Sequence, residues 1–298
     1  MNAGTRPLVS VIIPTYNHAH FLGRAMQSVL DQTYTNWEAI VIDNHSRDHT
    51  EEVVRSFADP RITLIKNHNN GVIAVSRNMG IRAAKGDWIA FLDSDDSWMR
   101  NKLAVCLEHS GDGVGLIYHD LDILRDHATH LQRRKIKTRQ VQSPVLFDLL
   151  INGNQIANSS VVVRKSLIDQ VGGIDENPKM VASEDYNTWL RIAQFTDAFL
   201  YIPQTLGSYR IHEAAVSNRN TSFSDKGAIA PFLNLLSDSQ HRRIDARLAY
   251  ISGSFHYGHR NYLAATKELK VSLRWGHWPI KLKSLYMIVG ALAKRVSI

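Results

Sequence analysis

The first hundred residues alternate between short apolar runs and longer amphipathic segments. Four β-branched or aromatic runs, residues 8–13, 37–42, 62–65 and 87–92, are typical of buried strands. The segments between them predict helices over residues 21–30, 48–57 and 73–84, and we expect Gly86 to end the last of these as a C-cap. Strands and helices in turn predict βαβ units and an α/β fold with a mostly parallel sheet flanked by helices.

The pattern is less regular beyond residue 110. Residues 114–118 and 159–163 have the character of strands, and residues 144–150 and 184–193 have the character of helices. The polar run 125–143 is long for a structured loop. A helical pattern then covers residues 247–257, 262–273 and 281–295. We therefore expect a main domain over residues 1–225 and a helical C-terminal region over residues 226–298.

Length and composition fit one large domain or two fused lobes. The 298 residues are 44% hydrophobic, enough for a substantial core. Cys106 is the single cysteine, which rules out an internal disulfide and agrees with a reducing cytosol. The first residues lack the pattern of a signal peptide, so we expect a cytoplasmic location.

Charge is concentrated at the C-terminal end. Of 35 Lys/Arg and 28 Asp/Glu, residues 226–298 hold 12 and 3, which leaves 23 and 25 in residues 1–225. A nucleic-acid-binding protein would carry the basic surface on its main fold, so we expect no nucleic-acid partner. The segment 281–295 has an apolar stretch of nine residues between basic ends, whereas a bilayer span needs about 20. It suits a peripheral position on the inner face of the cell membrane, and the alternative is an ordinary packed helix.

Polar clusters follow three of the predicted strands, at residues 14–17, 43–46 and 93–96. In a parallel sheet these clusters share the edge where ligands bind. Asp93, Asp95 and Asp96 would repel one another there, and a shared divalent cation would remove the repulsion. Oxygen ligands favour Mg²⁺ or Mn²⁺, which keep positions open for phosphate oxygens. The alternative is that the aspartates cap a helix that starts near Ser97.

Ordered motifs over residues 8–215 resemble those of the family 2 glycosyltransferases, which are inverting enzymes of the GT-A fold. The most specific block is a Ser-Arg-Asn-Met-Gly helix followed by the strand and turn 86–96, GDWIAFLDSDD. The other matching segments are VSVIIPTYN at 9–17, QTY at 32–34 with WE at 37–38, DNHSRD at 43–48, VGGIDE at 171–176, SEDY at 183–186 with WLR at 189–191, and YRIH at 209–212. The resemblance implies a nucleotide-sugar part over about 1–110 and an acceptor part over about 111–225.

The resemblance also implies which residues bind the donor, a nucleotide-diphosphate sugar. Pro14 and Tyr16 would border the base and ribose, and Asp43 and Asn44 would form the second nucleotide loop. Arg77 would reach toward the base or pyrophosphate, although it could instead pair with an acid on its own helix. Many relatives have aspartate at position 44, and the amide found here both donates and accepts. The base therefore stays open between uracil, thymine and guanine.

The resemblance implies two carboxylate stations. Asp95 would bind the metal (Mn²⁺ or Mg²⁺), with Asp93 near the ribose and His212 as a further contact to the metal or diphosphate. Asp185 would be the general base, with Glu184 as the alternative. The alternative for both acids is simple capping of the helix that follows Ser183. The pairs His18/His20 and His45/His49 lack supporting cysteines, so we predict no zinc site.

The predicted activity is metal-assisted, inverting transfer of a sugar to a hydroxyl of a saccharide or lipid-linked saccharide in cell-surface polysaccharide synthesis. A sugar nucleotidyltransferase would need a Gly-rich loop directly after the first strand, where residues 14–17 read PTYN. A non-catalytic binding module derived from such a transferase would be expected to lose one carboxylate station. Both Asp95 and Asp185 are present, which argues against that alternative.

Overall fold

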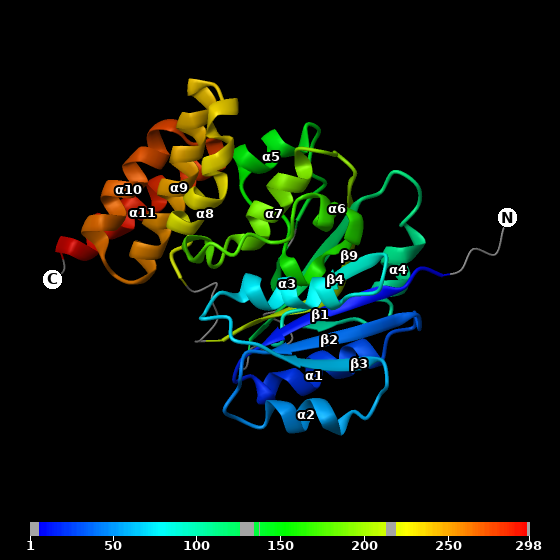
Figure 1. The fold of residues 1–298 in the computed structure, drawn as a ribbon. Coiled ribbons are helices and arrows are strands. Elements are labelled where there is room, and N and C mark those ends of the chain that lie inside the picture. The colour runs from blue at the N-terminus through cyan, green and yellow to red at the C-terminus, as the bar shows by residue number, and fades with distance from the viewer. Residues whose placement is uncertain (1–5, 126–133, 137, 213–218, 297–298) are drawn as a thin grey trace.

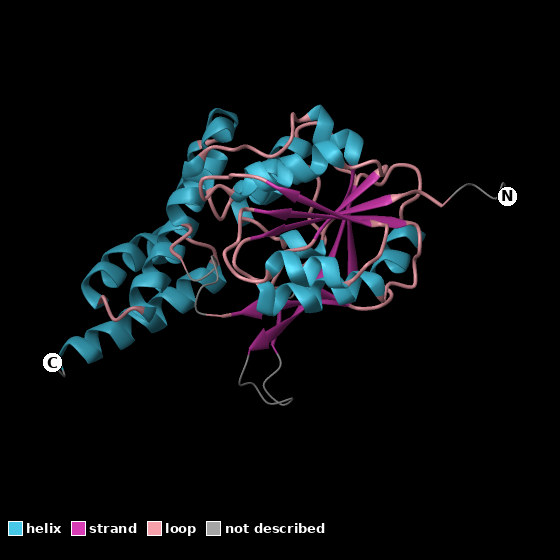
Figure 2. Ribbon diagram, turned by 60° about the horizontal axis from the view of Figure 1, so that its bottom comes forward, coloured by secondary structure: helices cyan, strands magenta, loops and turns pink. Residues whose placement is uncertain are grey.

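A computed structural model describes residues 6–125, 134–136, 138–212 and 219–296. Within them the chain forms a nine-stranded mixed sheet with helices on both faces, and further helices gather at one side of it (Figures 1 and 2). The strands are β1 (Val9–Thr15), β2 (Trp37–Asp43), β3 (Ile62–Lys66), β4 (Trp88–Phe91), β5 (Ser97–Trp98), β6 (Leu116–Arg125), β7 (Arg134–Ile136), β8 (Val162–Arg164) and β9 (Phe199–Ile211). The helices are α1 (Ala19–Leu30), α2 (Thr50–Ser56), α3 (Ile73–Ala83), α4 (Lys102–Glu108), α5 (Val145–Asn152), α6 (Lys165–Gln170), α7 (Glu184–Ala193), α8 (Ser222–Ile229), α9 (Asp238–Gly258), α10 (Tyr262–Trp275) and α11 (Trp278–Val296).

The first half of the sheet is parallel, as predicted. Strands β3, β2, β1 and β4 lie side by side in that order, with Val9 opposite both Trp37 and Trp88. All seven residues of β1 are buried, because helices cover both faces of this half. The polar clusters that follow β1, β2 and β4 therefore share one edge of the sheet.

The predicted role of Gly86 is wrong. Helix α3 ends at Ala83, and Ala84 follows in an extended conformation. Gly86 instead lies against β1, where a Cβ atom would be 2.6 Å from the Leu8 carbonyl oxygen. Its N–H donates to the Ser10 hydroxyl at 2.9 Å. A side chain is excluded here because two backbones approach each other closely.

The second half of the sheet is mixed and departs from two predictions. Strand β8 pairs antiparallel with β4 and begins only at Val162, because residues Asn158–Ser160 form a 3-10 turn. No helix starts near Ser97: Ser97 and Trp98 form β5, which pairs with β9, and α4 begins at Lys102. The interpretation of Asp93, Asp95 and Asp96 as helix caps is therefore wrong.

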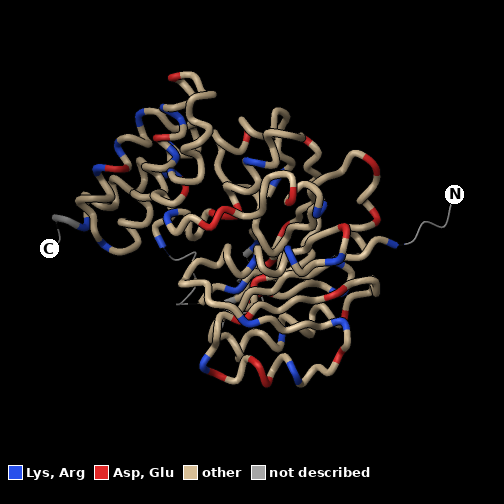
Figure 3. Tube along the Cα trace, in the orientation of Figure 1, with Lys and Arg blue, Asp and Glu red and all other residues tan. Residues whose placement is uncertain are grey.

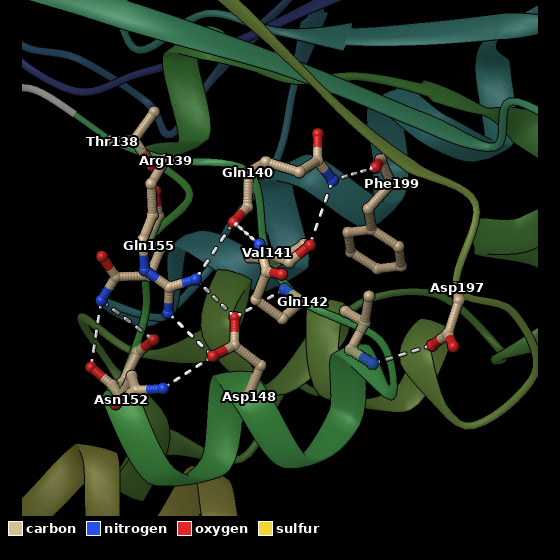
Figure 4. Close-up of polar contacts among 12 residues, drawn as sticks. Thr138, Arg139, Gln140, Val141, Gln142, Asp148, Asn152, Gln155, Asp197 and Phe199 are labelled. Carbon is tan, nitrogen blue, oxygen red and sulfur yellow. Dashed lines mark hydrogen bonds and ion pairs between the residues drawn. The ribbon is translucent and has the colours of Figure 1, made fainter.

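Part of the polar run 125–143 is structured. Strand β7 pairs with β6, while residues 126–133 and 137 lie outside the described residues. Figure 4 shows how the next segment is held against α5. Arg139 donates to both carboxylate oxygens of Asp148 at 2.8 Å, and the Gln140 amide donates to the Phe199 carbonyl at 2.7 Å. The predicted loop is thus an extended strap tied to α5 and β9.

The helices after residue 226 do not form one separate body. Phe232, Ile244 and Leu248 belong to the core that also contains residues of α5 and α7. Leu269 of α10 and Ile288 of α11 form a separate small cluster, against which α9 also packs through Tyr250 and Tyr257. Among the described residues, no helix combines the length and apolarity needed to cross a membrane.

Candidate active site

A cavity of about 550 Å³ opens at the edge of the sheet where the polar clusters lie. Five of the predicted site residues line it: Pro14, Arg77, Asp93, Asp95 and Asp185. A larger hollow of about 750 Å³ lies between α2 and β3 and contains none of the predicted residues. The fold therefore brings both predicted carboxylate stations into one cavity, although 90 residues separate them in the chain.

The aspartates that follow β4 face different partners. Asp95 Oδ2 lies 2.9 Å from Nε2 of His212, so the structure brings these two predicted metal contacts together. Asp96 is buried, and one of its oxygens accepts from the Arg210 backbone N–H at 2.9 Å. The other oxygen has no hydrogen-bond partner among the described residues. Burial, together with the charges of Asp95 and Asp93, raises the pKa of Asp96 well above its ordinary value.

This cluster fits a divalent cation that is held jointly with a ligand. Asp96 has a raised pKa and one oxygen without a hydrogen-bond partner among the described residues. Both are expected where carboxylates are crowded together, and a cation would relieve their repulsion. In the described part of the chain, no three His, Cys, Asp or Glu side chains converge as a ready-made cation cage. An open site suits Mg²⁺ or Mn²⁺, which take few protein oxygens and fill their remaining positions with phosphate and water.

Arg77 connects the two carboxylate stations. Its guanidinium is buried, and it donates to Glu184 at 2.6 Å and to Asp93 at 2.8 Å. Burial alone would lower the pKa of Arg77, but the charges of Asp93 and Glu184 raise it above its ordinary value. Neither acid lies on α3, so the alternative prediction, an ion pair between Arg77 and an acid on its own helix, is wrong.

Asp185 lies at the first turn of α7 and faces the cavity. One carboxylate oxygen accepts from the Tyr186 N–H at 2.6 Å, and the other lies 3.3 Å from the Asn154 amide nitrogen. Burial, followed by the charge of Glu184, raises the pKa of Asp185 to about 7. Ser183 makes no cap, because its hydroxyl donates to Asp225 at 2.6 Å.

Of the residues predicted in the two nucleotide loops, Pro14 lines the cavity, whereas Tyr16, Asp43 and Asn44 do not. Asp43 is buried and accepts from the Ser46 N–H at 3.0 Å. The Asn44 side-chain oxygen accepts from the Asn69 N–H at 2.8 Å, which leaves its amide N–H groups to donate to a ligand. Tyr16 is 49% exposed.

Sequence reasoning missed five polar residues of the cavity: His18, Asn158, Ser159, Arg219 and Thr221. His18 lies with Nδ1 2.8 Å from the Ser94 hydroxyl, and burial lowers its pKa despite the nearby charge of Asp95. Asn158 donates to Asp93 at 3.2 Å, and the Ser159 hydroxyl accepts from the Asp93 N–H at 3.1 Å. His18 follows the first nucleotide loop directly and could have been singled out on position. Ser159 was hidden because residues 159–163 were predicted as a strand, and Asn158 directly precedes that range.

Comparison with known sequences gives consistent matches. The family model described as Glycosyl transferase family 2 matches residues 10–168, more than half of the chain. The UDP-Glc:alpha-D-GlcNAc-diphosphoundecaprenol beta-1,3-glucosyltransferase WfgD of Escherichia coli is 30% identical over 213 residues, which cover 71% of this chain and 80% of WfgD. The putative teichuronic acid biosynthesis glycosyltransferase TuaG of Bacillus subtilis is 28% identical over 224 residues, 74% of this chain and 86% of TuaG.

Solved structures share the fold at low sequence identity. S. aureus TarS 1-349 in complex with UDP-GlcNAc has a TM-score of 0.65 at 14% identity, with 95% of this chain and 88% of that chain covered. The mannosyltransferase PcManGT from Pyrobaculum calidifontis, in complex with GDP-Man and Mn²⁺, has a TM-score of 0.62 at 18% identity, with 97% and 81% covered. These likenesses confirm the predicted GT-A fold.

Proposed function

Because the chain belongs to glycosyl transferase family 2, we propose that it moves a sugar from a nucleotide-diphosphate sugar to a hydroxyl of a lipid-linked or other saccharide, with inversion and metal assistance. The observation that carries the proposal is the arrangement of acids in the cavity. Asp95 stands beside His212, Glu184 is bound by Arg77, and Asp185 faces the cavity with a raised pKa.

On the acceptor side, we assign the general base to Asp185 and not to Glu184. Glu184 is buried and one of its carboxylate oxygens is bound by Arg77 at 2.6 Å, whereas Asp185 is only partly buried and makes no ion pair with Arg77. Asp185 has a pKa of about 7, which matches a base that must accept a proton near neutral pH. Asp185 would remove the proton as the acceptor hydroxyl attacks the anomeric carbon, and the bond to the diphosphate breaks in the same displacement.

On the donor side, Asp95 would hold the metal, with His212 and Asp96 beside it. When bound, the cation supplies positive charge that stabilises the departing diphosphate. Pro14, Tyr16, Asp43 and Asn44 would hold the nucleoside. Asp93 is fixed by Arg77 and Asn158 and would meet the ribose. Burial lowers the pKa of His18, and its ring would form one hydrogen bond to the donor.

The lipid-linked acceptor is supported by the relatives. WfgD is named for an acceptor joined to diphosphoundecaprenol, and TuaG for teichuronic acid synthesis. An enzyme with such an acceptor works at a membrane surface, so we propose a cytoplasmic protein that contacts the inner face of the cell membrane through its basic C-terminal helices.

Calorimetric titration with UDP, dTDP and GDP, each with Mn²⁺ and then with EDTA, tests the donor assignment. We expect one nucleotide to bind in a metal-dependent manner, which would also identify the base that Asn44 accepts. If folded protein binds none of them, the metal-diphosphate assignment is wrong and a non-catalytic glycan-binding module becomes the better description.

A further inference from the structure

Helix α11 turns a continuous apolar face toward solvent. Six large apolar side chains on it are 47 to 77% exposed: Trp278, Leu282, Leu285, Tyr286, Val289 and Leu292. At 100° per residue, their spacing places them within an arc of about 120° along a helix roughly 28 Å long. Fourteen large apolar side chains are exposed among the described residues, so nearly half of them lie on this one helix. We call these six residues the α11 apolar face.

The orientation of α11 is fixed by its opposite side. Ser284 and Ala291 are fully buried, and Ile288 is 7% exposed. The Ser284 hydroxyl lies 2.7 Å from that of Ser272 on α10, a buried polar contact. Rotating the helix to bury its apolar face would expose Ile288 and break this pair. The helix is therefore packed on α10 by one side and leaves the apolar side without a partner in the described chain.

The surroundings of this face are positively charged. Helix α11 contains no acidic residue, and Lys281 and Lys283 lie along it, while the Lys294 ammonium lies over the rings of Tyr257 and Tyr262. Residues 226–298 hold 12 basic and 3 acidic residues. Figure 3 shows Lys and Arg distributed along the C-terminal helices, at a distance from the sheet. A second copy of the chain would bring two such basic regions together, and the repulsion opposes a dimer through this face.

We infer that the α11 apolar face docks on an anionic phospholipid bilayer, with the helix lying in the interface and Lys281 and Lys283 on lipid phosphates. A helix that is apolar on one side and basic at its flanks is the form that binds in the plane of a membrane surface. Trp278 and Tyr286, with amphipathic rings, suit the headgroup level. The inference rests on the proposed function, because a lipid-linked acceptor would bring the protein to a membrane. Its test does not require catalysis.

Vesicle flotation of the full chain tests the inference. We expect the protein to float with vesicles of phosphatidylcholine and phosphatidylglycerol and to stay behind with phosphatidylcholine alone. Lys281→Glu with Lys283→Glu should weaken binding at least 25-fold, since each basic side chain near an anionic surface contributes about fivefold. Trp278→Ser with Tyr286→Ser should weaken it about tenfold or more, because less apolar area leaves water.

Phe195→Ser is the matched control. Phe195 is 58% exposed, as Val289 is, but follows α7 and not α11, so its replacement should leave flotation unchanged. The inference is overturned if the wild-type protein does not float with anionic vesicles. It is also overturned if Phe195→Ser weakens flotation as much as the substitutions on α11 do. A dimer in solution that the Trp278/Tyr286 variant dissociates overturns it too, in favour of self-association. Asp185→Asn should float like wild type, so a failure of the catalytic proposal would be seen separately.

Discussion

Arg77 is the residue on which the site depends most. Removing one partner from a buried ion pair lowers the stability of the fold, because the remaining charge stays buried without a partner. Asp93 follows β4 and Glu184 opens α7, and Arg77 binds both acids beside one cavity. The spacing of the sequence could not reveal this, since the contact to Glu184 spans 107 residues.

Replacing Arg77 with Met should therefore destabilise the protein by about 3 to 5 kcal/mol, because Glu184 loses its buried partner. Urea denaturation measures the change in the free energy of unfolding. Adding Glu184→Gln to Arg77→Met should recover part of the loss. If the double variant is no more stable than the single one, Arg77 does not act through Glu184.

Asp185 should set the acid limb of the rate profile. With a pKa of about 7, the carboxyl is protonated at low pH and cannot accept a proton from the acceptor. We expect kcat to fall about tenfold per pH unit below pH 7 and to level off above it. Steady-state rates across this range measure the limb, and a flat profile down to pH 5 would contradict the assignment.

Asp185→Asn should lower kcat by about 10² to 10⁴-fold while the Kd for the donor stays unchanged. Asp169→Asn is the control, because Asp169 is a 54% exposed acid paired with Lys165 on α6. A variant that loses donor affinity together with turnover would place Asp185 on the donor side instead. Calorimetry and rate measurements on the same preparation separate the two results.

Asp95→Asn should abolish the difference between Mn²⁺ and EDTA in nucleotide binding, because an amide is a weaker cation ligand than a carboxylate. The same calorimetric titration measures it. Wild-type metal dependence in this variant would move the metal assignment to Asp96 or Asp93.

At the scale of elements, the parallel half of the sheet was predictable and the mixed half was not. Continuous apolar runs identify β1, β2 and β4, because these strands are buried on both faces. Strands β5 and β8 have only two and three residues, too few for any periodicity. Their positions come from pairing with β9 and β4, which only the folded chain shows.

The contact of Gly86 with β1 gives an element-scale test. Gly86→Ala should lower the free energy of unfolding by about 1 to 3 kcal/mol, because its Cβ would clash with backbone atoms of Leu8 and Ser10. Gly111→Ala is the matched control, since a Cβ there meets nothing within 4 Å. Equal urea midpoints for the two variants would show that β1 can move aside.

At the scale of the whole molecule, the expected boundary at residue 225 divides a shared core. Ile244 and Leu248 of α9 pack with residues of α5 and α7, and Arg247 lies 3.3 Å from Asp225. Charge and helical pattern pointed to a unit over 226–298, because both change near residue 226. Packing does not follow composition here, and sequence periodicity carries no information about which core a helix joins.

A chain ended after residue 225 should therefore lack a cooperative unfolding transition, whereas one ended after residue 258 should keep it. The longer chain retains Phe232, Ile244 and Leu248 in the main core. Thermal unfolding followed by circular dichroism compares the two. A cooperative transition in the shorter chain would instead support the boundary at residue 225.

The reach of Arg77 also has a consequence for how the protein is made. The strands of the parallel half of the sheet lie within the first hundred residues, which are synthesised first. Arg77 lies among them, but its partner Glu184 is synthesised 107 residues later. At ribosomal rates of about 5 to 20 residues per second, those 107 residues take roughly 5 to 20 seconds. During that interval Arg77 lacks one of its two acids, so the buried ion pair forms only after residue 184 has emerged.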